Sequence, residues 1–165
     1  MNTRSAVVED APAIAFIYNE GIQDRVATFE TRLRSPDDIR IWFNEPRYPL
    51  IVVEDEGRVI AFASTSLYRP RDCYAGIAEY SVYVARAERG RGAGRAALLA
   101  LFAAAEAAGF WKMVSRIFVE NLASRALMRS VGFREVGIYE KHGQLDGVWR
   151  DVVIVERLLR PTLLG

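Results

Sequence analysis

The chain has 165 residues, of which 51% are hydrophobic and 26% are charged, and its formal net charge at pH 7 is +1. These values are typical of a globular domain that can bury a core, and they exclude a disordered chain. So small a net charge gives no general field for nucleic acid or anionic lipid, and we expect neither partner.

The cysteine content and the lack of a signal-peptide pattern or a long apolar run favour a cytoplasmic protein. The single cysteine, Cys73, cannot form an internal disulfide, which agrees with a reducing compartment. Residues 1–10 are polar and charged and lack the apolar centre of a signal peptide. No apolar run approaches the roughly 20 residues that span a bilayer. We therefore expect a cytoplasmic protein with no membrane partner.

Apolar periodicity and turn residues predict strands and helices in the first half of the chain. A short strand is expected over 5–9, followed by a helix that Asp10 caps and that has Pro12 in its first turn. Residues 35–38 are typical of a second helix start. The other elements predicted here are strands at 50–53, 59–67 and 77–84, of which the first two form a hairpin.

The second half begins with a long predicted helix over 95–108, which is rich in alanine and leucine, contains no proline and is ended by Gly109. One apolar stripe should bury it against the sheet, and its residues are Leu98, Leu101, Phe102 and Ala105. A strand, a helix and two strands are predicted to follow, at 113–119, 121–131, 132–140 and 152–155. No repeat or linker interrupts the series, so we expect one α/β domain over residues 1–165.

A glycine-rich stretch, 89–95, joins the predicted strand that ends at Val84 to the long helix. Glycines at alternate positions let the backbone turn and leave successive N–H groups uncovered. The helix behind them adds free N–H donors and the positive end of its dipole, and the arginines add charge. The stretch therefore predicts an anion site, the alternative being a tight strand-to-helix turn.

Two common phosphate motifs do not fit this stretch. A P-loop ends in Gly-Lys-Ser/Thr, whereas Gly94 is followed by Arg95 and Ala96. A dinucleotide fingerprint has the spacing G-x-G-x-x-G, which Gly90, Gly92 and Gly94 do not follow. Neither nucleoside triphosphate hydrolysis nor dinucleotide binding is expected.

The stretch 89–94 instead resembles the R/Q-G-x-G-x-G/A pyrophosphate loop of the GNAT superfamily of N-acetyltransferases, and residues 121–133 are similar to its N-x-x-S/A-x-x-L…G-F segment. More narrowly, the chain resembles the phosphinothricin N-acetyltransferase family, with its arsinothricin-acetylating relatives, over nearly its whole length. Residues that carry this resemblance include Tyr18-Asn19, Phe29-Glu30-Thr31, Arg47-Tyr48-Pro49, Tyr68-Arg69-Pro70-Arg71 and Glu79 to Val84. The resemblance implies a single-domain GNAT acyltransferase fold, with a mixed central sheet of about six or seven strands flanked by helices.

Glu79 is the candidate general base. In a strand, Glu79, Ser81 and Tyr83 share one face. An ammonium group must lose a proton before its nitrogen can attack a thioester, so the acceptor needs a proton-accepting group beside it. The resemblance places this role on Glu79, acting directly or through a water. The alternative is a solvated glutamate on an edge strand.

The resemblance also implies acetyl-CoA as the co-substrate. Two splayed parallel strands would leave the backbone of Val82, Tyr83 and Val84 free to pair with its pantetheine arm and to polarise the thioester carbonyl. The predicted pyrophosphate contacts are Arg89, Gly90, Arg91, Gly92, Ala93 and Gly94. Asn121 is expected to bind the cofactor, to cap the helix that begins there, or both.

The chain departs from the superfamily at the group that protonates the leaving thiolate. Many relatives have a tyrosine shortly before the Gly-Phe pair, and the aligned residue here is Met128. Water, Tyr139 and Ser124 stay open as proton sources, and a coenzyme A thiolate is a fairly good leaving group near neutral pH.

The expected acceptor is a small amino-acid analogue such as phosphinothricin, arsinothricin or methionine sulfoximine or sulfone, with detoxification as the outcome. Guanidinium groups suit phosphinate, arsinate or carboxylate, and aromatic side chains would hold the aliphatic part, although solvated loop arginines are the alternative. The residues that the resemblance places at the acceptor are Phe29, Glu30, Arg69, Arg71 and Tyr74. The family further implies a homodimer.

Other functions stay open. The transferase could act on another small amine or on a protein N-terminus, and a non-catalytic acetyl-CoA sensor is a third possibility, which predicts a site without a usable base. His142 is the only histidine, and it is expected to be a surface or dimer-contact residue. The segment 141–147 around it resembles that of the arsinothricin branch, a hairpin that reaches either the pocket or a second subunit, so His142 stays open as a minor site candidate. No metal site is predicted.

Overall fold

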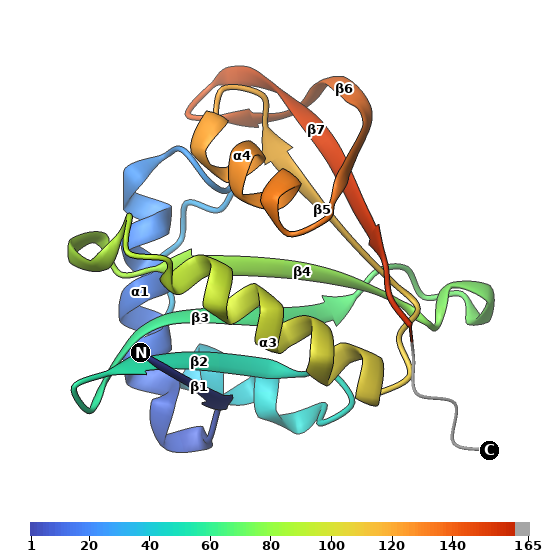
Figure 1. Ribbon diagram of the computed structural model, residues 1–165. Coiled ribbons are helices and arrows are strands. Elements are labelled where there is room, and N and C mark those ends of the chain that lie inside the picture. The colour runs from blue at the N-terminus through green and yellow to red at the C-terminus, as the bar shows by residue number, and fades with distance from the viewer. Residues whose placement is uncertain (161–165) are drawn as a thin grey trace.

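In the computed structural model, which describes residues 1–160, seven strands form one sheet in the order β1-β2-β3-β4-β5-β7-β6 (Figure 1). The strands β4 and β5 pair in parallel, and every other neighbouring pair is antiparallel. The mixed sheet confirms the predicted fold class. The strands are β1 Asn2–Ser5, β2 Leu50–Asp55, β3 Arg58–Leu67, β4 Ile77–Val84, β5 Lys112–Phe118, β6 Arg134–Leu145 and β7 Val148–Leu158.

Helices cover both faces of the sheet. Figure 1 shows α3 and α4 in front of the sheet and α1 behind it. Within residues 1–160 the α-helices are α1 Ala11–Asp24, α2 Pro36–Arg40, α3 Ala93–Ala107 and α4 Leu122–Ser130. Short 3-10 helices lie at Val8–Asp10, Ile41–Asn44, Asp72–Tyr74 and Arg86–Glu88.

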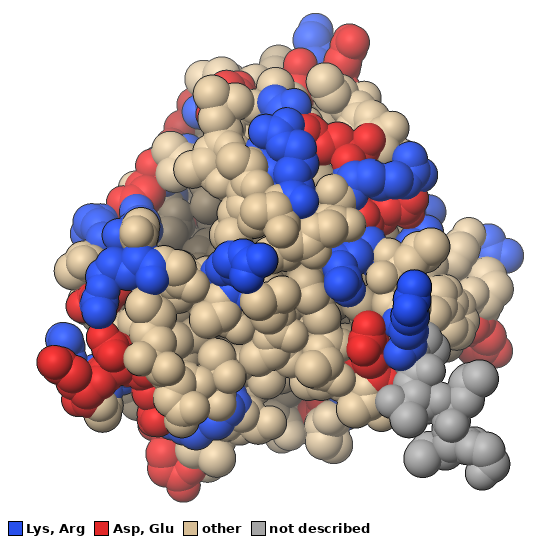
Figure 2. Space-filling view, in the orientation of Figure 1, with Lys and Arg blue, Asp and Glu red and all other residues tan. Residues whose placement is uncertain are grey.

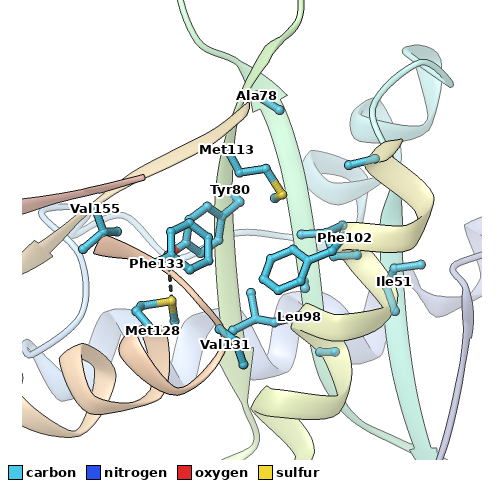
Figure 3. Packing of buried hydrophobic residues seen from close by; sticks show 14 of the residues in the cluster. Ile51, Ala78, Tyr80, Leu98, Phe102, Met113, Met128, Val131, Phe133 and Val155 are labelled. Carbon is cyan, nitrogen blue, oxygen red and sulfur yellow. Dashed lines mark hydrogen bonds between the residues drawn. The ribbon is translucent and has the colours of Figure 1, made fainter. Parts of the chain in front are cut away.

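Strand alternation divides the buried side chains into two main cores. On β2, Ile51 and Val53 join the core under α3, whereas Val52 packs with Phe62 against α1 and α2. The core under α3 also contains buried residues of α4 and of the segment after it (Figure 3). The predicted apolar stripe of α3 is confirmed, since its residues are at most 4% exposed: Leu98, Leu101, Phe102 and Ala105.

Three strand predictions were wrong in their bounds. The first strand ends at Ser5, where residues 5–9 were expected, because the Val7 N–H donates to the Asp10 carboxylate at 2.8 Å and closes a 3-10 turn. Asp10 therefore makes no side-chain cap on α1. The last two strands are longer than 132–140 and 152–155. They run into one hairpin whose turn, Asp146-Gly147, has positive φ at both residues.

The helix predictions need smaller changes. The helix α3 begins at Ala93, so the last two residues of the predicted loop, Ala93 and Gly94, form its first turn. Gly109 follows the end of α3 with φ of 91°, as a C-terminal glycine should. The hairpin of β2 and β3 and the strand over 77–84 are confirmed.

The parallel pair β4 and β5 separates along its length. Its ladder joins Ile77, Ala78 and Glu79 to Lys112, Met113 and Val114, and it ends there. Beyond that point β4 stays paired with β3 up to Val84, and β5 stays paired with β7 up to Phe118. A gap therefore opens in the middle of the sheet, directly after Glu79.

Candidate active site

A cavity of about 320 Å³ lies where β4 and β5 separate. It is lined by side chains from α1, from the segment after α1, from the two diverging strands and from the β6–β7 hairpin. Glu79, Ser81 and Tyr83 all line it, together with Tyr80. Tyr83 packs with the core against α1, whereas Tyr80, Val82 and Val84 belong to the core under α3, so alternate residues of β4 face opposite sides of the sheet, as predicted. The sequence-predicted base, Phe29 and Glu30 thus come together in one cavity.

Glu79 is not an edge-strand residue. It lies on β4, between β3 and β5, where its register partners are Ser66 and Val114. Its side chain is 24% exposed. The carboxylate is therefore set into the cavity, where a bound amine could reach it.

Arg116 of β5 forms an ion pair with Glu79, from Nη2 to Oε1. This residue was not among those predicted from the sequence. Arg116 lies two positions beyond Val114, so the side chains of Glu79 and Arg116 project from the same face of the sheet. The signal that could have found it is a charged residue inside the otherwise apolar or small run Met113 to Phe118 of a central strand.

A smaller cavity of about 70 Å³ adjoins the first across the gap. Val82, Asn121, Ser124 and Met128 line it, and it shares six lining residues with the larger cavity: Ala27, Tyr80, Ser81, Tyr83, Ser115 and Arg116. Two of the predicted cofactor-binding residues of β4 and Asn121 therefore border one space between β4, β5 and α4.

Asn121 caps α4. Its Oδ1 accepts a hydrogen bond from the Ser124 N–H at 3.2 Å, and its Nδ2 donates to the Val26 carbonyl at 3.2 Å. The capping role that the sequence left open is thus present. The second bond connects α4 to the segment after α1.

Met128 is buried beside Tyr80. The Tyr80 hydroxyl donates a hydrogen bond to Met128 Sδ at 2.7 Å, and burial raises the pKa of this hydroxyl well above its usual range. Of the other proton sources considered, Ser124 lines the small cavity, and Tyr139, which is half exposed on β6, lines another cavity that Glu79 also lines.

The glycine-rich loop connects the end of β4 to α3. Gly90 and Gly92 have φ of 80° and 86°, a region that favours glycine, so these two positions require it. Gly92 is the N-cap of α3, and its carbonyl accepts from the Ala96 N–H at 3.0 Å. The N–H groups of the first turn have no carbonyl acceptor within the helix, which makes this helix end a suitable place for an anion.

Two arginines of the loop are engaged by carboxylates. Arg89 pairs with Asp24 at 2.7 Å, and Arg91 pairs with Asp55 at 2.8 Å and also with Glu88. Hydrogen bonds from Arg86 and Arg89 hold the pKa of Asp24 below its usual range. Basic side chains on the face that carries α3 are spread in separate groups (Figure 2). The loop therefore offers backbone N–H groups more than free formal charge.

The segment after α1 packs against the end of β5 and is fixed to the β6–β7 hairpin. The ring of Phe29 meets the ring of Phe118 edge-on, with centroids 4.8 Å apart, and packs on Gly143. Arg25 forms an ion pair with Asp146 at 3.0 Å. Glu30 lines the main cavity but is itself paired with Arg34 at 2.8 Å.

The predicted acceptor arginines differ in position. Arg69 lines a cavity of about 190 Å³ together with Glu79, Arg116 and His142. Arg71 and Tyr74 line neither this cavity nor the main one. They lie together in the loop after β3, with the Arg71 guanidinium 5.9 Å from the Tyr74 ring. The structure thus brings one of the two arginines to the base.

An aromatic cavity of about 480 Å³ continues from the main cavity toward α2. The two share Tyr18, Ser66, Ser81 and Tyr83. Trp42, Tyr48 and Phe62 supply its apolar walls, and Arg34 and Glu45 supply its charges.

Two further features bear on the chemistry. Among residues 1–160 there is no cluster of three or more His, Cys, Asp or Glu side chains that could hold a metal ion. None of the helices that these residues form has the length and apolarity that crossing a bilayer requires.

Comparison with known proteins gives a consistent picture. The model of the acetyltransferase (GNAT) family matches residues 15–133. An L-methionine sulfoximine/L-methionine sulfone acetyltransferase from Pseudomonas paraeruginosa is 36% identical over 96% of this chain and 95% of its own length.

Two solved structures are similar to the whole fold. A phosphinothricin acetyltransferase from Sinorhizobium meliloti, in complex with acetyl-CoA, has a TM-score of 0.90 and 33% identity, covering 99% of this chain and 91% of its own. A ribosomal-protein-alanine N-acetyltransferase from Brucella melitensis has a TM-score of 0.92 and 34% identity, covering 96% of this chain and 100% of its own.

Proposed function

The chain belongs to the acetyltransferase (GNAT) family, and on that premise we propose that it transfers the acetyl group of acetyl-CoA to the α-amino group of a small amino-acid analogue. The observation that carries the proposal is the carboxylate of Glu79 in a cavity at the point where β4 and β5 separate. The proposed acceptors are of the phosphinothricin and methionine sulfoximine or sulfone type, in line with the names of similar proteins, and we add arsinothricin as an analogue of phosphinothricin.

The proposed chemistry begins with a proton transfer. Glu79 takes a proton from the acceptor's ammonium group, directly or through a water, and frees the nitrogen lone pair. The nitrogen then bonds to the acetyl carbon, the carbon–sulfur bond breaks, and the sulfur leaves with its electron pair as a thiolate. The nitrogen loses a second proton to become the amide, and the thiolate takes up one proton, directly or through a water. A backbone N–H at residues 82–84 would stabilise the negative charge on the carbonyl oxygen.

The residues present suit acetyl-CoA at two places. The backbone of β4 beyond Glu79 borders the open gap, where an extended chain can lie between β4 and β5. At the end of the same strand, the positive φ angles of Gly90 and Gly92 lead into the first turn of α3. We assign the pyrophosphate to the backbone N–H groups of residues 89–94, with Arg89 and Arg91 as charges beside it.

The acceptor would lie on the α1 side of the sheet. Phe29 closes one wall of the main cavity, and the aromatic cavity beside it could hold an aliphatic or sulfone-bearing side chain. Arg69, in the cavity that also contains Glu79, is the predicted arginine best placed for an acidic group.

We also propose a cytoplasmic homodimer with a detoxifying role. The β6–β7 hairpin exposes several large apolar side chains on its two faces, each at least 47% exposed, some of which a second copy could cover: Val136, Ile138, Tyr139, Val148 and Trp149. Sedimentation equilibrium tests the dimer directly. A monomer at concentrations where the enzyme turns over would contradict it.

One assay distinguishes the proposed function from two others, protein acetylation and acetyl-CoA sensing. Thiol release from acetyl-CoA is measured with amino-acid analogues, simple amines and a peptide with a free N-terminus. The proposal expects turnover with the analogues. Turnover confined to the peptide would favour protein acetylation, as in the name of the Brucella structure, and tight binding of acetyl-CoA without any turnover would favour a sensor.

The role of Glu79 is tested by Glu79→Gln, with Glu9→Gln, an exposed residue outside the cavities, as the matched control. Glu79→Gln should lower kcat by about 100-fold or more, the size of effect that general base catalysis supplies, while the Kd for acetyl-CoA stays within about twofold. Equal losses in turnover and in acetyl-CoA affinity would argue against Glu79 as the base.

A further inference from the structure

The ion pair between Glu79 and Arg116 places opposite charges side by side in the cavity of the proposed base. The two side chains come from neighbouring strands and meet where the ladder between those strands ends. Arg116 lines all three cavities that contact the gap. A molecule bound against Glu79 in this gap therefore also lies close to Arg116.

The pair is open to exchange with a ligand. The side chains of Arg116 and Glu79 are 48% and 24% exposed. Ion pairs with this exposure contribute little to stability, about 0–1 kcal/mol, so replacing the pair with other partners costs the fold little. The guanidinium group also has five N–H donors, more than one carboxylate oxygen can use.

The pair in its present state competes with catalysis. Arg116 donates to Oε1 of Glu79, so an ammonium group that binds this carboxylate has to share it with a second positive charge, and the two cations repel each other. The Nη1 atom of Arg116 lies 3.5 Å from Nε2 of His142. A second anion beside Arg116 would draw the guanidinium away from Glu79.

An α-amino acid carries the charges that complement this arrangement. Its carboxylate and its ammonium group are attached to the same carbon, so they can contact an arginine and a glutamate that lie next to each other. One ion pair within the protein is then replaced by two between protein and ligand. An amine without a carboxylate, or the N-terminus of a peptide, offers only the positive half.

We propose that Arg116 binds the α-carboxylate of the acceptor and thereby releases Glu79 to take the proton of the α-ammonium group. The inference rests on the proposed acetyltransferase function and adds to it a reason for selecting free amino acids. Arg116 is in this sense a specificity-determining residue, and its pairing with Glu79 is exchanged only for a zwitterionic substrate.

The test compares two acceptors that differ only in the carboxylate: L-methionine sulfone and 3-(methylsulfonyl)propylamine. Thiol release is measured for the wild type, for Arg116→Gln and for Arg134→Gln. Arg134 is an exposed arginine that pairs with Glu156 and lies outside the main cavity, so it is the matched control.

For the sulfone, Arg116→Gln should raise KM by about 10- to 100-fold, the loss expected for a charge-assisted hydrogen bond. For the amine without a carboxylate, kcat/KM should stay equal or rise. This acceptor makes no contact with Arg116 that the substitution could remove, and Glu79 is no longer paired in the variant. Arg134→Gln should change neither. Each comparison is made between variants on one acceptor, so the different basicities of the two amines cancel.

A loss of equal size for both acceptors would overturn the inference, since it would mean that Arg116 only supports the position of Glu79. Arg116→Lys provides a second reading if the glutamine variant does not fold, and it should give a smaller rise in KM for the sulfone only. If the wild type turns over neither these acceptors nor any other amine, the proposed function itself fails, which is a different result.

Discussion

The hydroxyl of Tyr80 donates a hydrogen bond to Sδ of Met128, 2.7 Å away, and so joins β4 to α4 behind the gap in the sheet (Figure 3). Tyr80 and Met128 are 3% and 2% exposed, and both belong to the core under α3. A thioether is a weak acceptor, so this contact satisfies the phenol without binding it strongly. The two side chains also line the small cavity at the gap.

Tyr80→Phe is expected to lower the free energy of unfolding by about 1 kcal/mol, because one buried hydrogen bond is lost while the ring stays. Urea unfolding measures it, and a double-mutant cycle with Met128→Leu shows whether the loss belongs to this contact. In the Met128→Leu background, Tyr80→Phe should lower the free energy of unfolding by less than in the wild type, because the sulfur acceptor is already gone. Strict additivity would mean that the two residues do not interact.

The stability of the protein should depend on pH through Asp10. Hydrogen bonds from Arg4, at 2.7 and 2.9 Å, and from the Val7 N–H hold the pKa of Asp10 below its usual range. A lowered pKa in the folded state adds stability that is complete above the unfolded value of about 3.9, and that is lost as the pH falls through the folded value.

Asp10→Asn should therefore lower the free energy of unfolding at pH 7 by about 1.5–3 kcal/mol, as expected for hydrogen bonds to a charged group. The difference from the wild type should shrink as the pH falls below about 4. Urea unfolding between pH 7 and pH 2 gives both values. The same difference at every pH would show that the charge of Asp10 contributes nothing.

Gly21 lets α1 approach the cavity wall closely. A Cβ atom added there would lie 2.6 Å from Cδ1 of Tyr83, which is closer than real contacts allow. Gly21→Ala should therefore displace Tyr83, with a loss of stability of about 1–3 kcal/mol and a fall in kcat/KM. Gly137→Ala is the matched control, because nothing lies within 4 Å of its added Cβ. Equal behaviour of both variants in thermal unfolding and turnover would contradict this role of Gly21.

Two glycines test the prediction that residues 89–94 bind the pyrophosphate. They have similar backbone conformations, but one lies in this loop and the other in the turn between β2 and β3. Gly92 and Gly57 have φ of 86° and 75°, and a Cβ added at either meets open space. Gly92→Ala and Gly57→Ala should each cost about 1–2 kcal/mol of stability through strain at positive φ. Calorimetry should show weaker binding of coenzyme A for Gly92→Ala only. Similar affinities for the two variants would place the pyrophosphate elsewhere.

The sequence predicted most of the fold because its signals are local. The helical stripe of α3, the polar turn between β2 and β3 and the alternating face of Glu79 each follow from residues close in the chain. The bounds of β1, β6 and β7 failed for a physical reason. Glycine and charged residues in β6 weaken the strand pattern, and pairing with β7 stabilises this edge strand nevertheless.

The candidate site was predicted in part. Glu79, Phe29 and Glu30 share a cavity as expected, but Arg71 and Tyr74 lie away from it. Arg116 could not be placed, because its contact with Glu79 depends on the register between β4 and β5, which are 37 residues apart at this pair. Register between distant strands is a property of the assembled sheet.

The packing of Phe29 on Gly143 constrains how this pocket can change. A Cβ added at Gly143 would lie 2.9 Å from the Phe29 ring, and Arg25 and Asp146 hold the same two segments together. A larger side chain at position 143 therefore needs a smaller one at position 29. A smaller side chain at position 29 alone leaves a void beside Gly143. Redesign of the enzyme for bulkier acceptors has to alter both positions in the same step, since either change alone breaks the wall that they share.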